Sequence, residues 1–123
     1  MLSFKKLIQS FSDAYCGLKV SLKEEQNLRI ELGLAFLAIL LGIYFHLLAL
    51  EWIVLWLTIA LIIGSELINT ALEKTVDLAS PEIHPLAKKA KDAAAAAVFI
   101  FSIMAVLVGL FLFLPKILGH DLF

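Results

Sequence analysis

Cysteine and charge are both scarce in this chain. One cysteine, Cys16, among 123 residues excludes an intrachain disulfide, and no Cys/His spacing typical of a zinc site occurs. We expect Cys16 to be a small buried residue, as free thiols usually are. Charged residues form 17% of the chain and sum to a net charge of −1, and no nucleic-acid partner is expected. The first residues lack the continuous apolar core of a cleavable signal peptide, so we expect the N-terminus to stay on the mature protein.

Hydrophobic residues, in contrast, are in large excess. They form 62% of the sequence, and mean hydropathy is +0.98. Soluble globular domains contain about 45–50% apolar residues. A soluble domain this short buries only a modest part of its apolar surface, whereas a lipid bilayer accommodates all of it. The composition therefore predicts an integral membrane protein of one domain.

Helical patterning divides this domain, residues 1–123, into four segments of an all-α fold. In residues 1–30, apolar side chains recur at helical spacing with lysines between them. This pattern predicts an amphipathic helix at the membrane surface; the alternative is a soluble helix packed on a partner. Apolar runs then predict three membrane helices, at 33–50, 52–78 and 86–114.

Turn residues and lysines set the expected topology. A turn is predicted at 46–51, where His46 is interpreted as an interfacial residue and not a metal ligand. Pro81 and Pro85 separate the second and third spans, and Pro115 is expected to end the third. Nine of the ten Lys and Arg residues then lie on one side of the bilayer. The positive-inside rule predicts a cytoplasmic N-terminus and an external C-terminus, as three spans require.

A stripe of polar residues runs along the second predicted span. At about 100° per residue, Glu66, Asn69, Glu73 and Asp77 share one helix face. Glu66 lies roughly 10 Å deeper than Glu73, inside the cytosolic leaflet. A charged acid at the bilayer centre costs at least about 2.5–3.5 kcal/mol, so such residues usually serve a function. The stripe predicts a catalytic site with Glu66 as general base; simple hydrogen bonding between helices is the alternative.

Two further polar clusters map to the same side. One precedes the third span, and the other joins the surface helix to the first span. Lysines there are suited to phosphate groups, and acids to Mg²⁺, which are the parts that phosphoryl transfer needs. No P-loop or protein-kinase signature occurs, so ATP use does not follow from a nucleotide-binding motif. The two clusters are Glu82, His84, Lys88, Lys89, Lys91 and Asp92, and Glu24, Glu25, Gln26, Asn27, Arg29 and Glu31.

In these segments the sequence resembles the prokaryotic diacylglycerol kinase family of small membrane lipid kinases. The matching motifs run from Glu66 to Asp77 (ELINTALEKTVD) and from His84 to Val98 (HPLAKKAKDAAAAAV), with a weaker match over 25–29. The resemblance covers nearly the whole chain. It implies Mg²⁺- and ATP-dependent phosphorylation of a lipid hydroxyl in the bacterial inner membrane. It also implies a homotrimer whose active sites are shared between subunits.

The resemblance also implies roles for single residues. Glu66 would be the catalytic base, Asn69 would position the reacting groups, and Glu25 and Glu73 would bind the metal. The implied nucleotide contacts are Asp13, Glu25, Glu73, Asp77, Glu82, His84, Lys91 and Asp92. The implied lipid contacts are Glu66, Arg29 and Ala95.

The substrate is predicted from the branch of the family. His84-Pro-Leu-Ala-Lys88 and Phe113-Leu-Pro-Lys116 are similar to the Gram-positive-type branch, which is associated with phosphorylation of undecaprenol. Ala94-Ala95 and Ile30 depart from the Gly-Ser pair and the Gln that are usual in the Gram-negative-type branch. Undecaprenol is therefore the predicted acceptor and diacylglycerol the alternative. The non-enzymatic alternative is a small membrane channel or scaffold protein.

Overall fold

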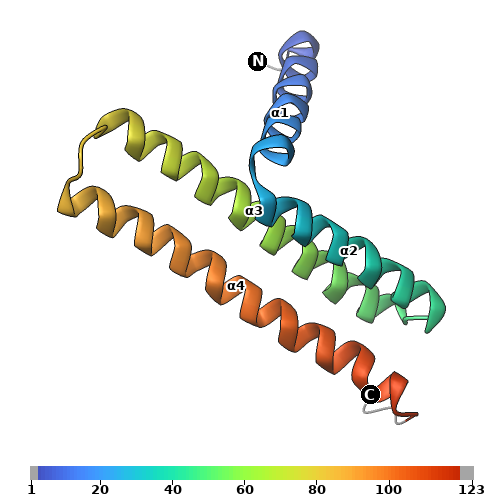
Figure 1. Ribbon diagram of the computed structural model, residues 1–123. Coiled ribbons are helices and arrows are strands. Elements are labelled where there is room, and N and C mark those ends of the chain that lie inside the picture. Colours follow the sequence, from blue (N-terminus) through green and yellow to red (C-terminus); the bar gives the residue numbers. More distant parts are fainter. Residues whose placement is uncertain (1–2, 120–123) are drawn as a thin grey trace.

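The structure is a computed structural model that describes residues 3–119, and in this part of the chain it consists of four α-helices (Figure 1). Helices α2, α3 and α4 lie side by side, and α1 rises away from them near the middle of α3. Residues 1, 2 and 120–123 of the predicted domain lie outside the described residues. The helices are α1 (Phe4–Glu24), α2 (Gln26–Tyr44), α3 (Ala49–Ala79) and α4 (Pro85–Ile117).

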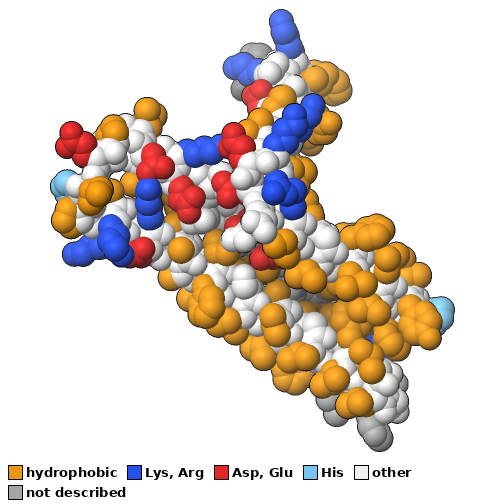
Figure 2. All heavy atoms as spheres, viewed as in Figure 1, with side chains coloured by type: hydrophobic (Ala, Val, Ile, Leu, Met, Phe, Trp, Pro, Cys, Tyr) orange, Lys and Arg blue, Asp and Glu red, His pale blue; other side chains and the backbone are white. Residues whose placement is uncertain are grey.

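Three of the four helices are long and apolar enough to cross a membrane. They are α2, α3 and α4, with 19, 31 and 33 residues. Many of their large apolar side chains are exposed, which is favourable only where lipid covers them. Figure 2 shows charged side chains gathered over α1 and the neighbouring end of the α3–α4 hairpin, with hydrophobic side chains covering the opposite end. The prediction of an all-helical fold with three helices able to cross a membrane is confirmed over residues 3–119.

The first helix ends earlier than the sequence predicts. Instead of continuing to residue 30, α1 stops at Glu24, and α2 begins at Gln26 rather than at residue 33. Glu25 alone is extended between them, with φ −107° and ψ 110°. The apolar run marks the part of a helix that lies in lipid, and α2 continues beyond it through the polar residues of the interface. Cys16, expected to be buried, is exposed on α1 because little of α1 packs on the other helices.

The turn between α2 and α3 lies at 45–48 and overlaps the predicted turn at 46–51, whereas the predicted first span extends too far. Helix α2 ends at Tyr44 rather than at residue 50, and His46 has a left-handed backbone with φ 54°. The amide N–H of Leu47 donates to the Gly42 carbonyl at 3.1 Å, and that of His46 to the Ile43 carbonyl at 3.3 Å. This pairing is a Schellman motif, which satisfies the last carbonyls of a helix. A backbone motif, rather than loss of hydrophobicity, therefore ends the helix.

Gly42 is required by close packing beside this turn. A Cβ atom there would lie 2.8 Å from the Trp52 ring and 2.9 Å from a Leu47 methyl group, whereas a Cβ at Gly33 meets nothing within 4 Å. Overpacking costs about 1–3 kcal/mol, while removing a helical glycine contributes up to about 1 kcal/mol. We expect Gly42→Ala to be about 1–3 kcal/mol less stable than its matched control, Gly33→Ala. Unfolding in denaturing detergent measures this, and equal stability of the two variants would contradict the packing.

The end of the bundle farthest from α1 is held by an apolar cluster and an ion pair. Leu47, Leu55, Leu112 and Phe113 are buried together, and Lys116 Nζ lies 3.1 Å from Glu51 Oε2. Glu51 Oε1 also accepts a hydrogen bond from the Leu48 amide at 3.0 Å.

Helix α3 spans 49–79 instead of 52–78, and α4 spans 85–117 instead of 86–114. Pro115, predicted to end α4, lies within its last turn, because packing and the Lys116 contact hold that turn together.

Candidate functional site

The polar stripe on α3 forms the centre of the site. Glu66 is 6% exposed, and within residues 3–119 its carboxylate makes no hydrogen bond or ion pair. Asn69 lies one turn beyond Glu66 on α3, and Glu73 lies two turns beyond it. Asn69 Nδ2 donates a hydrogen bond to Glu73 Oε1 at 3.2 Å. The other amide atom, Asn69 Oδ1, is buried without a hydrogen-bond partner among the described residues. A buried acid and a buried acceptor are thus both left for a ligand to satisfy.

The elbow between α1 and α2 brings Glu25 to this stripe. Glu25 is the single extended residue between the two helices, and its carboxylate is close enough to Glu66 for their charges to interact. The charge of Glu73 also acts on Glu66. Glu25 at the elbow therefore adds a third negative charge near the two carboxylates of α3, Glu66 and Glu73. Like charges repel one another, and a bound cation would offset that repulsion.

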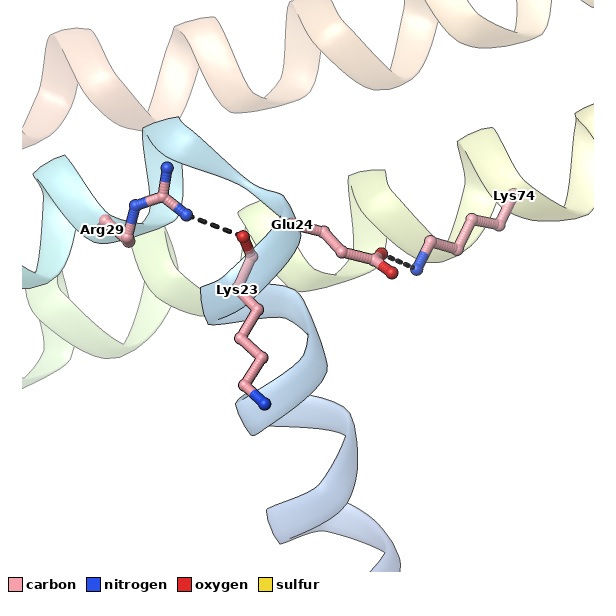
Figure 3. A network of polar contacts seen from close by, with 4 residues as sticks. All are labelled: Lys23, Glu24, Arg29 and Lys74. Carbon is pink, nitrogen blue, oxygen red and sulfur yellow. Dashed lines mark hydrogen bonds and ion pairs between the residues drawn. The ribbon is translucent and has the colours of Figure 1, made fainter.

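Arg29 has a local role in the elbow that the sequence analysis did not foresee. Its guanidinium donates to the carbonyl oxygen of Leu22 at 2.8 Å and to that of Lys23 at 2.9 Å. Figure 3 shows the bond to Lys23. These carbonyls belong to the last turn of α1, where no further amide continues the helix. Arg29 therefore closes the end of α1 and sets the direction of the chain into α2. Its predicted contact with lipid stays a prediction.

Five of the predicted nucleotide residues lie at the end of the α3–α4 hairpin where the two helices are joined, namely Asp77, Glu82, His84, Lys91 and Asp92. An ion pair joins Asp77 of α3 to Lys91 of α4, and Lys88 Nζ lies 2.6 Å from Asp92 Oδ2. His84 caps α4, because its Nδ1 accepts the Leu86 amide at 3.1 Å. Glu82 is exposed in the loop. The two basic side chains and their acidic partners form a polar end that continues the stripe from Glu73.

Two predicted residues are not joined to this centre in one chain. Asp13 lies on the exposed part of α1, where its Oδ1 accepts from Gln9 Nε2 at 2.9 Å. Ala95 is exposed on α4. Over residues 3–119, no hydrogen bond or ion pair connects Asp13 with Glu66 or Glu73.

Glu31 is a neighbour of Glu66 that the sequence analysis placed in a polar cluster but gave no role of its own. It lies on α2, is partly buried, and its charge interacts with that of Glu66. It also lines an apolar groove of about 300 Å³ between α2, α3 and α4. A signal was present in the sequence, since residues 28, 31, 35, 38 and 42 follow helical spacing, and all five are buried or partly buried.

The donor set suits a metal ion shared with phosphates. Across residues 3–119, no group of three or more His, Cys, Asp or Glu side chains is arranged to hold a metal alone. Mg²⁺ is usually bound by one or two carboxylates together with substrate phosphates and water. Glu73, which accepts a hydrogen bond from Asn69, and Glu25, whose charge also acts on Glu66, supply two carboxylates of this kind.

The sequence of this chain is similar to those of several known kinases. Residues 12–113 match the sequence model of prokaryotic diacylglycerol kinase. The chain is 38% identical to undecaprenol kinase of Bacillus subtilis over 112 residues, which cover 91% of each protein. It is 42% identical to diacylglycerol kinase of Synechocystis over 92% of this chain and 65% of that protein. It is 44% identical to diacylglycerol kinase of Helicobacter pylori over 76% of this chain and 73% of that protein.

Proposed function

The chain belongs to the prokaryotic diacylglycerol kinase family, and we propose that it is a lipid kinase that transfers phosphate from ATP to undecaprenol. The observation that carries this proposal is Glu66, a residue only 6% exposed on a membrane helix, whose carboxylate makes no hydrogen bond or ion pair within residues 3–119. The apolar groove at Glu31 lies nearby. A lipid alcohol brings its hydroxyl to that depth while its tail stays in apolar surroundings. Undecaprenol is favoured over diacylglycerol because the Bacillus subtilis undecaprenol kinase matches along almost its full length.

Glu66 acts as the general base in the proposed reaction. It accepts the proton of the lipid hydroxyl, whose oxygen forms a bond to the γ-phosphorus of ATP. The bond between that phosphorus and the oxygen bridging it to the β-phosphate breaks, and ADP leaves. Asn69 is placed to orient the acceptor, since its Oδ1 is available for a hydroxyl donor. Phosphoryl transfer depends mainly on such positioning and on neutralising phosphate charge.

Charge neutralisation is divided between a metal and basic side chains. Glu25 and Glu73 would hold Mg²⁺, which when bound would offset the negative charge of the ATP phosphates. Lys91 lies at the cytosolic end of the hairpin, paired with Asp77, where it would reach the nucleotide. Asp77, Glu82, His84 and Asp92 are proposed to contact the rest of the nucleotide. Both lysine and carboxylate are needed, because ATP and its metal carry opposite charges.

We further propose a homotrimer in the bacterial inner membrane, with a cytoplasmic N-terminus and an external C-terminus. Clustering of charge at one end of the molecule supports the orientation (Figure 2). Shared sites are supported by Asp13, which lies on a part of α1 that projects away from its own bundle (Figure 1). In an assembly, Asp13, Arg29 and Ala95 would complete the nucleotide and lipid contacts of a neighbouring chain.

Substrate preference is tested by offering two acceptors in parallel. We expect phosphate transfer from labelled ATP in mixed micelles to be faster to undecaprenol than to diacylglycerol, and to be lost in Glu66→Gln. The reason is the branch of the family to which the chain is most similar in its motifs. Faster labelling of diacylglycerol would make diacylglycerol the preferred acceptor and would leave the proposed phosphoryl transfer unchanged. Absence of labelling of either lipid by folded protein would contradict the proposed function.

A further inference from the structure

A salt bridge joins two elements of the site that are far apart in the sequence. Lys74 Nζ on α3 lies 2.6 Å from Glu24 Oε2 at the last residue of α1, and 50 positions separate the two residues (Figure 3). Glu24 immediately precedes Glu25, and Lys74 immediately follows Glu73. The bridge therefore connects the chain neighbours of both proposed metal ligands.

Apolar packing holds the α2 side of this elbow, because Leu28, three residues after Glu25, is 1% exposed. Glu25 is its only extended residue, and α1 makes little contact with α3. Arg29 closes the end of α1 onto α2, but it does not reach across to α3. Apolar packing does not by itself fix the direction of a polar side chain at the elbow. Among residues 3–119, the bridge from Lys74 to Glu24 is the hydrogen bond or ion pair that joins the elbow to α3, and the charge of Lys74 also interacts with Glu25.

The bridge contributes little to the stability of the whole fold. The side chains of Lys74 and Glu24 are 54% and 52% exposed, and exposed ion pairs contribute at most about 1 kcal/mol. A weak tether is still sufficient to restrict the position of Glu25, a single extended residue between two helices. Metal affinity is sensitive to such groups, because loss of an outer partner typically weakens it about 10–100-fold.

We propose that Lys74 is a positioning residue, which through Glu24 holds Glu25 beside Glu73 so that the two carboxylates can share one divalent cation. This inference rests on the proposed lipid kinase function for its catalytic consequence. Its structural part, the tether itself, can be measured without any turnover.

The catalytic consequence is read from the Mg²⁺ dependence of phosphate transfer. We expect Lys74→Met to raise the Mg²⁺ concentration at half-maximal rate by about tenfold, with little change in the rate at saturating Mg²⁺. Lys74→Arg keeps the charge and should stay within a factor of two of the unmodified protein. The matched control is Lys19→Met, which removes an exposed lysine from α1 away from the elbow. A lower rate at saturating Mg²⁺ with no shift in Mg²⁺ dependence would overturn the proposal.

The tether is tested by measuring a distance between α1 and α3. One spin label is attached to the exposed Cys16 and another to Leu78→Cys, which is 85% exposed at the end of α3, with labelled chains diluted in unlabelled protein. We expect a narrow distribution that broadens in Lys74→Met and narrows again in the Glu24→Lys, Lys74→Glu exchange. An unchanged distribution in Lys74→Met would overturn the tether. If the distribution broadens but the protein phosphorylates no lipid, the tether stands and the proposed function fails.

Discussion

Glu66→Gln is expected to reduce phosphate transfer by about 10²–10⁴-fold, which is the usual contribution of a general base. The amide has the size and shape of the carboxyl group but cannot accept the proton of the lipid hydroxyl. Because the Glu66 carboxylate makes no hydrogen bond or ion pair within residues 3–119, its replacement removes no structural contact of that kind. Initial rates with labelled ATP and undecaprenol measure the effect.

Thr70→Val is the matched control for this variant. Thr70 is also buried on α3, one turn closer to the loop between α3 and α4, and is 7% exposed. It has no acid or base function, so we expect its variant to keep activity within a few-fold. Thermal unfolding should show both variants folded. Near-normal turnover in folded Glu66→Gln would refute the role of the base and leave Glu31 as the neighbouring acid to test.

Glu73→Ala is expected to weaken nucleotide binding by at least about tenfold at limiting Mg²⁺, because ligating groups and their partners contribute about 10–100-fold to metal affinity. Two effects combine here. The variant removes a proposed metal ligand, and it also removes the acceptor of the Asn69 amide hydrogen bond. Equilibrium dialysis with labelled ATP over a range of Mg²⁺ concentrations measures the change without turnover.

The control for Glu73→Ala is Thr75→Ala. Thr75 lies two residues further along α3, where its hydroxyl donates to the Ala71 carbonyl on an exposed face. We expect nucleotide affinity to be unchanged in this variant at every Mg²⁺ concentration. Excess Mg²⁺ should partly restore binding in Glu73→Ala, since Glu25, the other proposed ligand, would still favour the cation. Equal affinity of Glu73→Ala and the unmodified chain at limiting Mg²⁺ would remove Glu73 from the metal site.

Much of the site on α3 was predictable because one helix carries it. A regular helix fixes the angle between residues, so the shared face of Glu66, Asn69 and Glu73 follows from their spacing. The hydrogen bond between Asn69 and Glu73 agrees with that geometry. The breaks at Pro81 and Pro85 were predictable for the same reason, since both residues act on the backbone locally.

Helix ends were less predictable, because hydropathy reports lipid exposure and not backbone conformation. Helix α2 starts in the polar interface at Gln26 and stops at Tyr44 among apolar residues. Its end depends on the left-handed backbone of His46 and on the space above Gly42. Neither feature changes the hydrophobicity of the segment, so an apolar run could not reveal it.

The sequence by itself determined the class of this protein, its three membrane helices and the acidic face of α3, because composition and helical period act locally. The tertiary structure decided which distant residues meet that face. It brought Glu25 and Glu31 to Glu66, Lys74 to Glu24, and Lys91 to Asp77. It also turned Arg29 back onto the end of α1. Such contacts depend on the direction in which one helix leaves another, and a single extended residue at Glu25 sets that direction here.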